Sequence, residues 1–366
     1  MATGRRVGVL GHFGNPATPI DGQIMRTRLV HQQFCERLGC ESVTRVDTGK
    51  MKRAPLRTII ELGKCVRNSD HVVIMPASRG LRWLMPWYSF WRKRYGTRFH
   101  FFVVGGWLPE FLQERPRLLR QVRGLGALYV QTKAMRLRLK EMGFPEVFLF
   151  PNFRDFPSLS AKRYQQAGAL RLVYYSRVTE SKGIELAIRA VNDCRAPVSL
   201  DIWGPVDQGY QARFEKILSD SAGRVSYRGV LTGSRIYQEL SRYDLLLFPT
   251  FYEGEGFPGA ILDAFSSGLP VIASDWRYNT EFVEDAQHGF IVPVHDHQAI
   301  RERLEELSER PEQLEPMSLA VLESARLYHV DQVFPQVMED MGLLPSASTA
   351  QVMARTRQHV AMDVNR

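Results

Sequence analysis

One stretch of the chain, residues 170–192, decides the fold class: it reads LRLVYYSRVTESKGIELAIRAVN. Its first part, Leu170–Ser176, is a short apolar run of the kind that forms buried parallel strands. A polar turn follows, and Gly183–Asn192 then has the composition of a helix. A buried strand followed by a helix is the repeating unit of a doubly wound parallel sheet.

The same alternation continues on both sides of this stretch. Toward the C-terminus we predict strands at Val198–Trp203, Val225–Tyr227, Leu245–Phe248, Val271–Ala273 and Phe290–Val292, and helices at Gln211–Asp220, Ser234–Ser241, Gly259–Ser267 and His297–Ser308. Toward the N-terminus we predict strands at Arg6–Leu10, His71–Met75, Phe99–Val104, Ala127–Val130 and Val147–Phe150, and helices at Thr27–Leu38, Arg57–Val66 and Lys133–Met142. The sequence therefore predicts an α/β protein with two Rossmann-like, doubly wound domains.

A stretch rich in proline, serine and charge interrupts the alternation between residues 151 and 169. We therefore assign residues 1–155 to a first domain, 156–169 to a linker and 170–335 to a second domain. Residues 336–366 would form a C-terminal helix and tail, for which the first domain is the candidate packing surface.

The charge is unevenly distributed between the two halves. Of the 366 residues, 1–155 hold 27 Lys and Arg against 11 Asp and Glu, a net charge of +16, and the remainder carries −7. A basic half indicates an anionic partner such as phospholipid, since no nucleic-acid-binding module is recognisable. No apolar run approaches the ~18 residues of a membrane span, and we expect a cytoplasmic protein.

The most informative motif is EGEGFPGAILDAFSSGLPVIAS, residues 253–274. Glycines and Pro258 directly before an apolar helix allow the backbone to approach a ligand, and the helix start offers unpaired N–H groups. Asp263 lies among apolar helix residues, where an unpaired carboxylate is costly. It therefore needs donors, either the two hydroxyls of a ribose or a protein group such as a backbone amide or an arginine.

The spacing of Glu255 and Asp263, eight positions apart, resembles the acidic pair of retaining glycosyltransferases of family 4, which have the GT-B fold of two Rossmann-like domains across a cleft. That family usually has glutamate at both positions, so Asp263 is one methylene shorter. The resemblance, strongest over 170–293, implies that Glu255 contacts the donor sugar and Asp263 the ribose. It further implies a donor-binding loop made of Gly256, Phe257, Pro258 and Gly259.

A second match lies at Ser176–Gly183, directly after a predicted strand. There the resemblance implies that Arg177 and Lys182 neutralise the donor diphosphate and act with Glu255 in catalysis. Taken without the family, the two basic residues are better explained as surface charges on a turn. With two cations in that role and no Asp-x-Asp motif in a suitable loop, we expect neither a metal ion nor a cofactor.

The first predicted strand runs into a glycine-rich segment that resembles the family loop closing over the donor from the opposite domain. Gly14, Gly22 and Gln23 are the residues it implies as donor-binding. Many family members also place a histidine near the sugar after a later strand of this domain. No histidine stands there in this chain, and neither His12 nor His100 is assigned that role.

Residues 79–95, RGLRWLMPWYSFWRKRY, combine aromatic and basic side chains as membrane-surface helices do. The predicted membrane contacts are Arg82, Trp83, Trp87, Trp91, Arg92, Lys93 and Arg94. A helix packed on the core with its charges in solvent is the alternative. On the first interpretation the protein is peripheral on the cytoplasmic face of the inner membrane.

The resemblance implies an enzyme that moves a hexose from a nucleotide-sugar donor to a lipid-linked or polysaccharide acceptor with retention of configuration. A UDP-sugar is favoured and GDP-mannose is the second candidate, in a setting of bacterial capsule or exopolysaccharide assembly. Two alternatives stay open. The absent histidine and the shortened acid at 263 leave room for a non-catalytic nucleotide-sugar-binding subunit, and the scaffold also suits a nucleotide-sugar epimerase.

Overall fold

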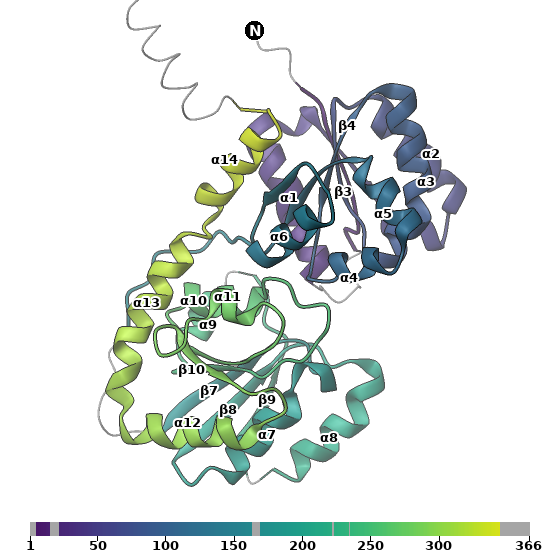
Figure 1. The fold of residues 1–366 in the computed structure, drawn as a ribbon. Helices are drawn as coiled ribbons and strands as arrows, with labels where there is room; N and C mark the ends of the chain where they lie inside the picture. The colour runs from purple at the N-terminus through teal and green to yellow at the C-terminus, as the bar shows by residue number, and fades with distance from the viewer. Residues whose placement is uncertain (1–4, 15–21, 163–168, 222, 234, 345–366) are drawn as a thin grey trace, which may run out of the picture.

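The computed structural model describes residues 5–14, 22–162, 169–221, 223–233 and 235–344. Two sheets, each of six parallel strands and flanked by helices, stand one above the other in Figure 1. The predicted α/β class with two doubly wound domains is confirmed.

The first sheet has the strand order β2-β1-β3-β4-β5-β6 and the second has β12-β11-β10-β7-β8-β9. The strands of the first are β1 Val7–Gly11, β2 Val43–Asp47, β3 His71–Met75, β4 Arg98–Phe102, β5 Gly126–Val130 and β6 Val147–Leu149. Those of the second are β7 Leu170–Tyr175, β8 Val198–Trp203, β9 Val225–Gly229, β10 Leu245–Phe248, β11 Val271–Ser274 and β12 Gly289–Val292.

The helices of the first domain are α1 Gly22–Leu38, α2 Pro55–Arg67, α3 Ser78–Tyr95, α4 Leu108–Gln113, α5 Pro116–Arg123 and α6 Lys133–Glu141. Those that follow are α7 Ile184–Asp193, α8 Gln211–Ser219, α9 Arg235–Leu240, α10 Gly259–Ser266, α11 Asn279–Phe282, α12 His297–Glu309, α13 Leu314–Arg326 and α14 Val330–Asp340. In the part of the chain described, no helix is both long and apolar enough to cross a bilayer.

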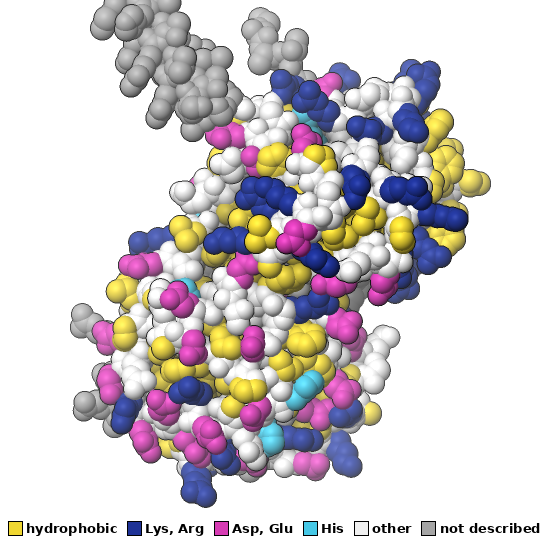
Figure 2. Space-filling view, viewed as in Figure 1, with side chains coloured by type: hydrophobic (Ala, Val, Ile, Leu, Met, Phe, Trp, Pro, Cys, Tyr) yellow, Lys and Arg dark blue, Asp and Glu magenta, His cyan; other side chains and the backbone are white. Residues whose placement is uncertain are grey.

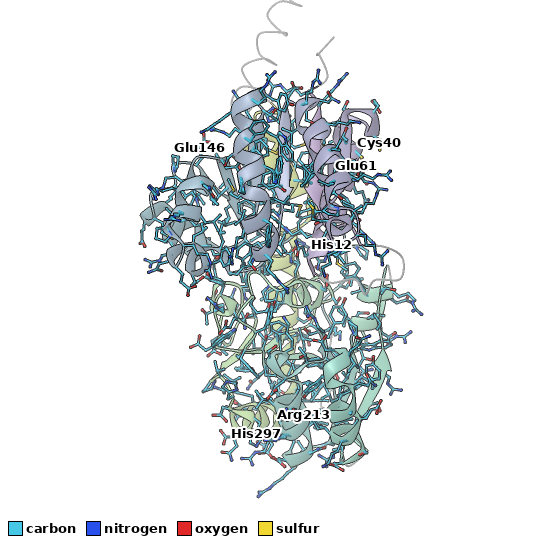
Figure 3. All side chains as sticks on the ribbon, turned by 90° about the vertical axis from the view of Figure 1, so that its right-hand side faces the viewer. His12, Cys40, Glu61, Glu146, Arg213 and His297 are labelled. Carbon is cyan, nitrogen blue, oxygen red and sulfur yellow. The ribbon has the colours of Figure 1, made fainter. Side chains whose placement is uncertain are left out.

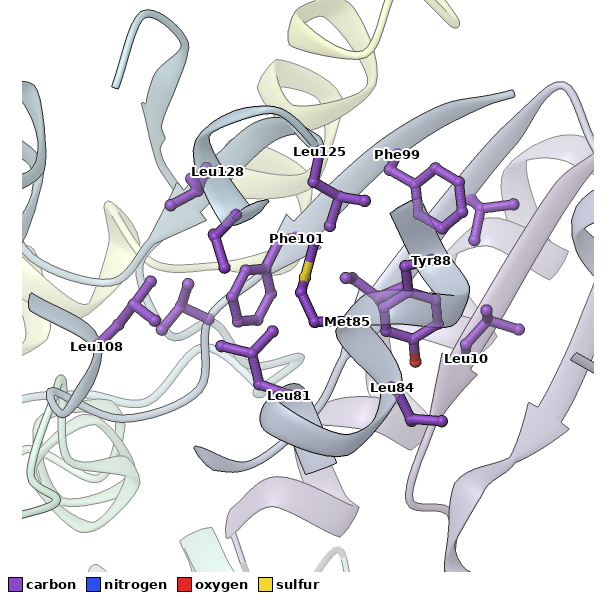
Figure 4. Packing of buried hydrophobic residues seen from close by; sticks show 14 of the residues in the cluster. Leu10, Leu81, Leu84, Met85, Tyr88, Phe99, Phe101, Leu108, Leu125 and Leu128 are labelled. Atoms are coloured by element: carbon purple, nitrogen blue, oxygen red, sulfur yellow. The ribbon is translucent and has the colours of Figure 1, made fainter. Parts of the chain in front are cut away.

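The strands of the first domain are covered by apolar side chains on both faces. On one face, Met85 and Tyr88 of α3 pack against Phe99 and Phe101 of β4, as Figure 4 shows. Burial on both faces is why these strands read as continuous apolar runs in the sequence.

The last described helix belongs spatially to the first domain. Phe334, Val337 and Met338 of α14 join the cluster that covers the second face of the first sheet, where Phe34 of α1 also lies. The chain thus crosses between the domains twice, and the two crossings are joined by a bridge between Arg154 and His329. The predicted tail after residue 344 lies outside the described residues.

Candidate active site

The second sheet changes its direction of winding between β7 and β10, which are neighbours although two other strands separate them in the chain. In open parallel sheets, ligands bind outside the carboxyl ends of the strands at such a switch point, because the two following loops diverge there. The loop after β7 carries Arg177 and Lys182, and the loop after β10 carries Thr250 and Glu255. The two sequence motifs therefore meet where the topology favours a ligand.

Lys182 and Glu255 form an ion pair between these two loops. The Glu255 carboxylate is 6% exposed, and the Thr250 hydroxyl donates a hydrogen bond to its Oε1 at 3.0 Å. The Lys182 ammonium also lies 4.6 Å from the centre of the Tyr252 ring, within the range of a cation–π contact. A carboxylate, an ammonium group and a hydroxyl are thus held together at one point.

Arg177 lies in the same loop as Lys182 but points to solvent. Its guanidinium reaches Asp207 only at 4.0 Å, and the side chain is 43% exposed. The hydroxyl of Tyr174 donates to the backbone carbonyls of both Arg177, at 3.0 Å, and Lys182, at 3.2 Å. Burial raises the pKa of Tyr174 well above its ordinary value, so this hydroxyl stays a donor that fixes the loop.

The loop before α10 is pressed against the first domain. The Gly106 amide, in the loop after β4, donates to the carbonyl of Gly254 at 3.1 Å. A Cβ atom at Gly106 would lie 1.9 Å from the carbonyl oxygen of Glu255, so only glycine permits this approach. The Gln131 carboxamide, after β5, accepts from Gly105 at 3.0 Å. The carboxyl ends of the two sheets consequently face each other across these loops.

The predicted donor-binding loop is built as a helix entry. Pro258 is the residue before the first helical residue, Gly259, and Gly256 and Phe257 are buried. The Phe257 ring stacks on Phe282 with a centroid distance of 3.7 Å inside the core of the second domain. The side chain of Phe257 therefore belongs to the core, and the backbone of the loop is what remains for contact with a donor, which stays a prediction.

Asp263 has a protein partner, which is one of the two possibilities that the sequence left open. Its carboxylate, 2% exposed, accepts from Arg154 Nε at 2.8 Å and from Arg154 Nη2 at 3.4 Å. Burial raises the pKa of Asp263, and the charge of Arg154 acts in the opposite direction. Arg154 was not predicted, because an arginine in the crossover segment PNFRDF is not distinguishable by sequence from a surface charge.

The glycine-rich segment of the first domain is described only at its ends. Gly14 has a φ of +65°, Gly22 is the exposed first residue of α1, and the Gln23 side chain donates to the Met75 carbonyl at the end of β3 at 3.0 Å. His12, just after β1, lies on the side of the first domain that faces the second (Figure 3). Their contact with a donor stays a prediction.

His100 is part of a buried chain of hydrogen bonds in the first sheet. It lies 3.0 Å from His71 and 3.3 Å from the Tyr129 hydroxyl. Burial, with His71 and Arg98 adding to it, lowers the pKa of His100 to about 3. A neutral, inward-facing imidazole in the middle of the sheet accounts for this histidine without a role at the sugar.

The predicted membrane contacts fall on two sides of α3. Trp83 is 76% exposed and Trp87 42%, and Arg82, Arg92, Lys93 and Arg94 are exposed as well. Trp91 is the exception: it is 5% exposed and packs in the core against Tyr88 and the backbone of Gly63. Its prediction as a membrane contact is wrong: each step of four residues turns the side chain by about 40° around the helix, so position 91 lies about 80° from position 83 and reaches the buried side.

No cluster of three metal-ligating side chains occurs among the residues that the structure describes. A cavity of about 580 Å³ lies at the amino ends of β4 and β5, opposite the ends that carry the site. It is lined by Arg98, His100, Glu146 and Asp340 among others, and of all the predicted residues only Arg92 reaches it.

Residues 169–310 match the family model described as "Glycosyl transferases group 1". The amylovoran biosynthesis glycosyltransferase AmsK of Erwinia amylovora is 29% identical over 160 residues, which cover 41% of this chain and 39% of that protein. The phosphatidyl-myo-inositol mannosyltransferase of Mycobacterium leprae is 27% identical over 225 residues, or 58% of each chain. The chain thus spans about two fifths to three fifths of the length of these two relatives.

Solved structures share the fold over more than nine tenths of the chain. Anabaena HepE in complex with UDP and glucose aligns with a TM-score of 0.71 at 14% identity, covering 93% of this chain and all of that one. Sucrose-phosphate synthase from Thermosynechococcus elongatus aligns with a TM-score of 0.71 at 15% identity, covering 96% of this chain and all of that one. The predicted GT-B fold is confirmed, and it carries a second domain that matches glycosyl transferases group 1.

Proposed function

We propose that this protein is a retaining hexosyltransferase of polysaccharide biosynthesis. It takes its sugar from a nucleotide-sugar donor, a UDP-sugar rather than GDP-mannose, and transfers it to a lipid-linked or saccharide acceptor. The observation that carries the proposal is the Lys182–Glu255 pair at the switch point of the second sheet. The pair lies inside the segment that matches glycosyl transferases group 1, and the similar HepE holds UDP and glucose in its crystal structure.

In the proposed reaction the donor divides this pair. Lys182, whose flexible stem carries a rotatable ammonium, turns to the donor diphosphate, where Arg177 joins it. Glu255, released from Lys182, accepts hydrogen bonds from the sugar hydroxyls. The acceptor oxygen bonds to the anomeric carbon on the face from which the diphosphate oxygen departs, and the acceptor proton passes to that oxygen. The two cations stabilise the negative charge on the leaving diphosphate, so no metal ion is needed.

A screen of UDP-, GDP- and ADP-sugars for nucleotide release, with and without membrane lipid, tests the proposal. We expect one donor to release nucleotide only when acceptor is present, in the presence of a metal chelator, and Glu255→Ala to abolish release. A change in the donor sugar without acceptor would instead identify an epimerase. Tight nucleotide binding without any turnover would identify a binding subunit.

We further propose that the acceptor is reached at a membrane surface formed by α2 and α3. Trp83, Trp87 and Phe90 of α3 are exposed, and so are Leu56 and Ile60 of α2, at 77% and 58%. Figure 2 shows hydrophobic and basic side chains together over these two helices. Aromatic side chains among basic ones are typical of helices that lie in the headgroup region.

Sedimentation with vesicles of phosphatidylcholine, with and without phosphatidylglycerol, tests this surface. Trp83→Ser with Phe90→Ser should weaken binding to the anionic vesicles about tenfold or more. Tyr227→Ser, which removes an aromatic side chain from the second domain, 37% exposed in the structure, is the control and should not weaken it. Equal binding of all three proteins would refute the assignment of the surface to α2 and α3.

A further inference from the structure

Arg154 comes from the crossover between the domains, yet it completes the interior of the second domain. The two hydrogen bonds to Asp263 form a parallel fork, and Nη1 donates to the Phe153 carbonyl at 3.0 Å and to the Asn152 carboxamide at 3.4 Å. The Arg154 backbone is tied to the returning crossover by hydrogen bonds with Tyr328 and Val330. Asp263, Phe153 and Asn152 together therefore hold the guanidinium in one place.

Asn152, two residues earlier, reaches the predicted donor loop directly. Its Nδ2 donates to the carbonyl of Phe257 at 3.1 Å. The first residue of α10, Gly259, lies against the arginine, since a Cβ atom there would be 2.5 Å from Arg154 Nη2. The start of α10, which the motif assigns to the donor, is consequently shaped by two side chains from outside the second sheet.

The first domain holds this segment in place through Arg26 of α1. Arg26 is 2% exposed and donates to the Asn152 carboxamide oxygen at 2.8 Å and to the carbonyls of Phe150 and Pro151, each at 2.9 Å. Burial, together with the charge of Arg154, lowers the pKa of Arg26 to about 9. Because α1 begins at Gly22, this arginine also belongs to the helix that follows the predicted donor loop of the first domain.

We propose that Arg154 is a positioning residue for the donor ribose: it fixes the Asp263 carboxylate so that the free lone pair of each oxygen can accept a ribose hydroxyl. The proposal rests on the proposed function. An arginine fork uses one lone pair on each carboxylate oxygen, and two sites remain. Where the family has the longer glutamate, the Arg154 fork holds a shorter carboxylate in a single orientation.

The arrangement also makes donor affinity depend on the domain junction. Asp263, Arg154, Asn152 and Arg26 form an unbroken series of hydrogen bonds from α10 to α1. A change in the first domain that displaces Asn152 would therefore reach the ribose site without touching the second sheet.

Calorimetric titration of the intact 366-residue chain tests the proposal. The probes are uridine and guanosine diphosphate, each paired with its 2′-deoxy counterpart, and the readout is the ratio of the two dissociation constants. The wild-type protein should prefer the ribonucleotide roughly tenfold or more, since a hydroxyl bonded to a charged group is lost in the deoxy probe. Arg154→Met should reduce that ratio toward one.

Two further variants separate positioning from stability. Arg154→Met combined with Asp263→Leu replaces the buried ion pair by apolar side chains and should recover thermal stability but not the ratio. Arg154→Lys keeps the charge without the fork and should lower the ratio while the protein stays folded. The control is Arg171→Met, which breaks another arginine–aspartate pair of the second domain, with Asp244, and should leave the ratio unchanged.

The outcomes are distinguishable. If the ratio of the wild type persists in Arg154→Lys or in the double variant, Arg154 does not position a ribose ligand and the inference is overturned, while the proposed function stands. If the wild-type protein binds neither nucleoside diphosphate, the proposed function itself fails, and the inference with it.

Discussion

The motif at residues 253–274 contains two buried acids, Glu255 and Asp263, and the structure gives each of them a different kind of basic partner. Glu255 is paired with Lys182, a single rotatable ammonium on a flexible stem, and shares its Oε1 with Thr250. Asp263 is paired with Arg154, whose fork is rigid and whose other nitrogen donates to the chain that supports it. The Lys182 ammonium can turn to an anion that binds nearby, whereas the Arg154 guanidinium remains bonded to Asp263. Two acids that are both buried thus differ in how firmly their partners hold them.

The largest effect should come from breaking the Arg154–Asp263 pair. Arg154→Met leaves a buried carboxylate without a partner, and we expect a loss of about 3–5 kcal/mol in the free energy of unfolding. Urea unfolding measures it. Lys182→Met is the matched comparison, and it should cost about 1 kcal/mol or less, because Thr250 still donates to Glu255. Equal losses in the two variants would remove the distinction between the pairs.

Glu255→Gln should slow sugar transfer while leaving the stability of the protein almost unchanged. The amide keeps the size of the side chain but loses the charge that the proposed reaction uses. We expect the rate of sugar transfer to fall about 100- to 1,000-fold, with the unfolding free energy changed by about 1 kcal/mol or less. Steady-state kinetics with the donor found in the screen measures the first quantity. An unaltered rate would show that Glu255 does not take part in transfer.

The pH dependence of stability gives a sharper comparison. Burial raises the folded-state pKa of Asp263 above its ordinary value of 3.8, so the folded protein holds this proton more tightly than the unfolded chain does. The unfolding free energy therefore falls as the pH rises from about 3.8 through the raised pKa. Without the charge of Arg154 that pKa rises further, and Arg154→Met should extend the decline to higher pH.

The expected slope in that window is about 1.4 kcal/mol per pH unit. Unfolding curves between pH 4 and pH 8 for the wild type, for Arg154→Met and for the variant that also carries Asp263→Leu measure it. The double variant has no carboxyl at this position and should lack the extra slope. The same slope in both variants would mean that another group titrates.

Thr250→Val should have the smallest effect. Thr250 is fully buried, and valine keeps its shape while removing the hydroxyl that donates to Glu255 and accepts from the Tyr252 amide at 3.2 Å. We expect the free energy of donor binding to weaken by about 0.5–1.5 kcal/mol, a few-fold loss of affinity, because the hydrogen bond that orients Glu255 is lost. Thr250→Ser, which keeps the hydroxyl, serves as the control. If valine and serine bind the donor alike, Thr250 does not orient Glu255.

The sequence was sufficient for most of the architecture, because buried parallel strands are continuous apolar runs. The strand β2, VTRVD, was missed since it is an edge strand with Thr44 and Arg45 exposed, and only two of its residues are buried apolar ones. The short helices α4 and α5 were missed as well, because each is too brief to establish a helical period.

The site was predicted only in part, because some of its contacts join residues that are far apart in the sequence. Lys182 and Glu255 belong to two motifs that a single switch point brings together. Arg154 contacts Asp263 across 109 residues, and no local pattern encodes a contact of that kind. The buried and exposed tryptophans of α3 could not be told apart for a related reason. Tryptophan occurs both in cores and at surfaces, and only the packing of Trp91 against α2 shows that it is buried.

The contacts that the crossover segment makes with both domains have a consequence for protein engineering. Two-domain proteins are often used to build chimeras, in which the first domain of one protein is joined to the second domain of another at the linker. In this molecule, a graft made after residue 156 would leave Arg26, Asn152 and Arg154 with the discarded half and orphan the carboxylate of Asp263. A transplant that keeps the Asp263 carboxylate paired must carry those three residues along as a unit.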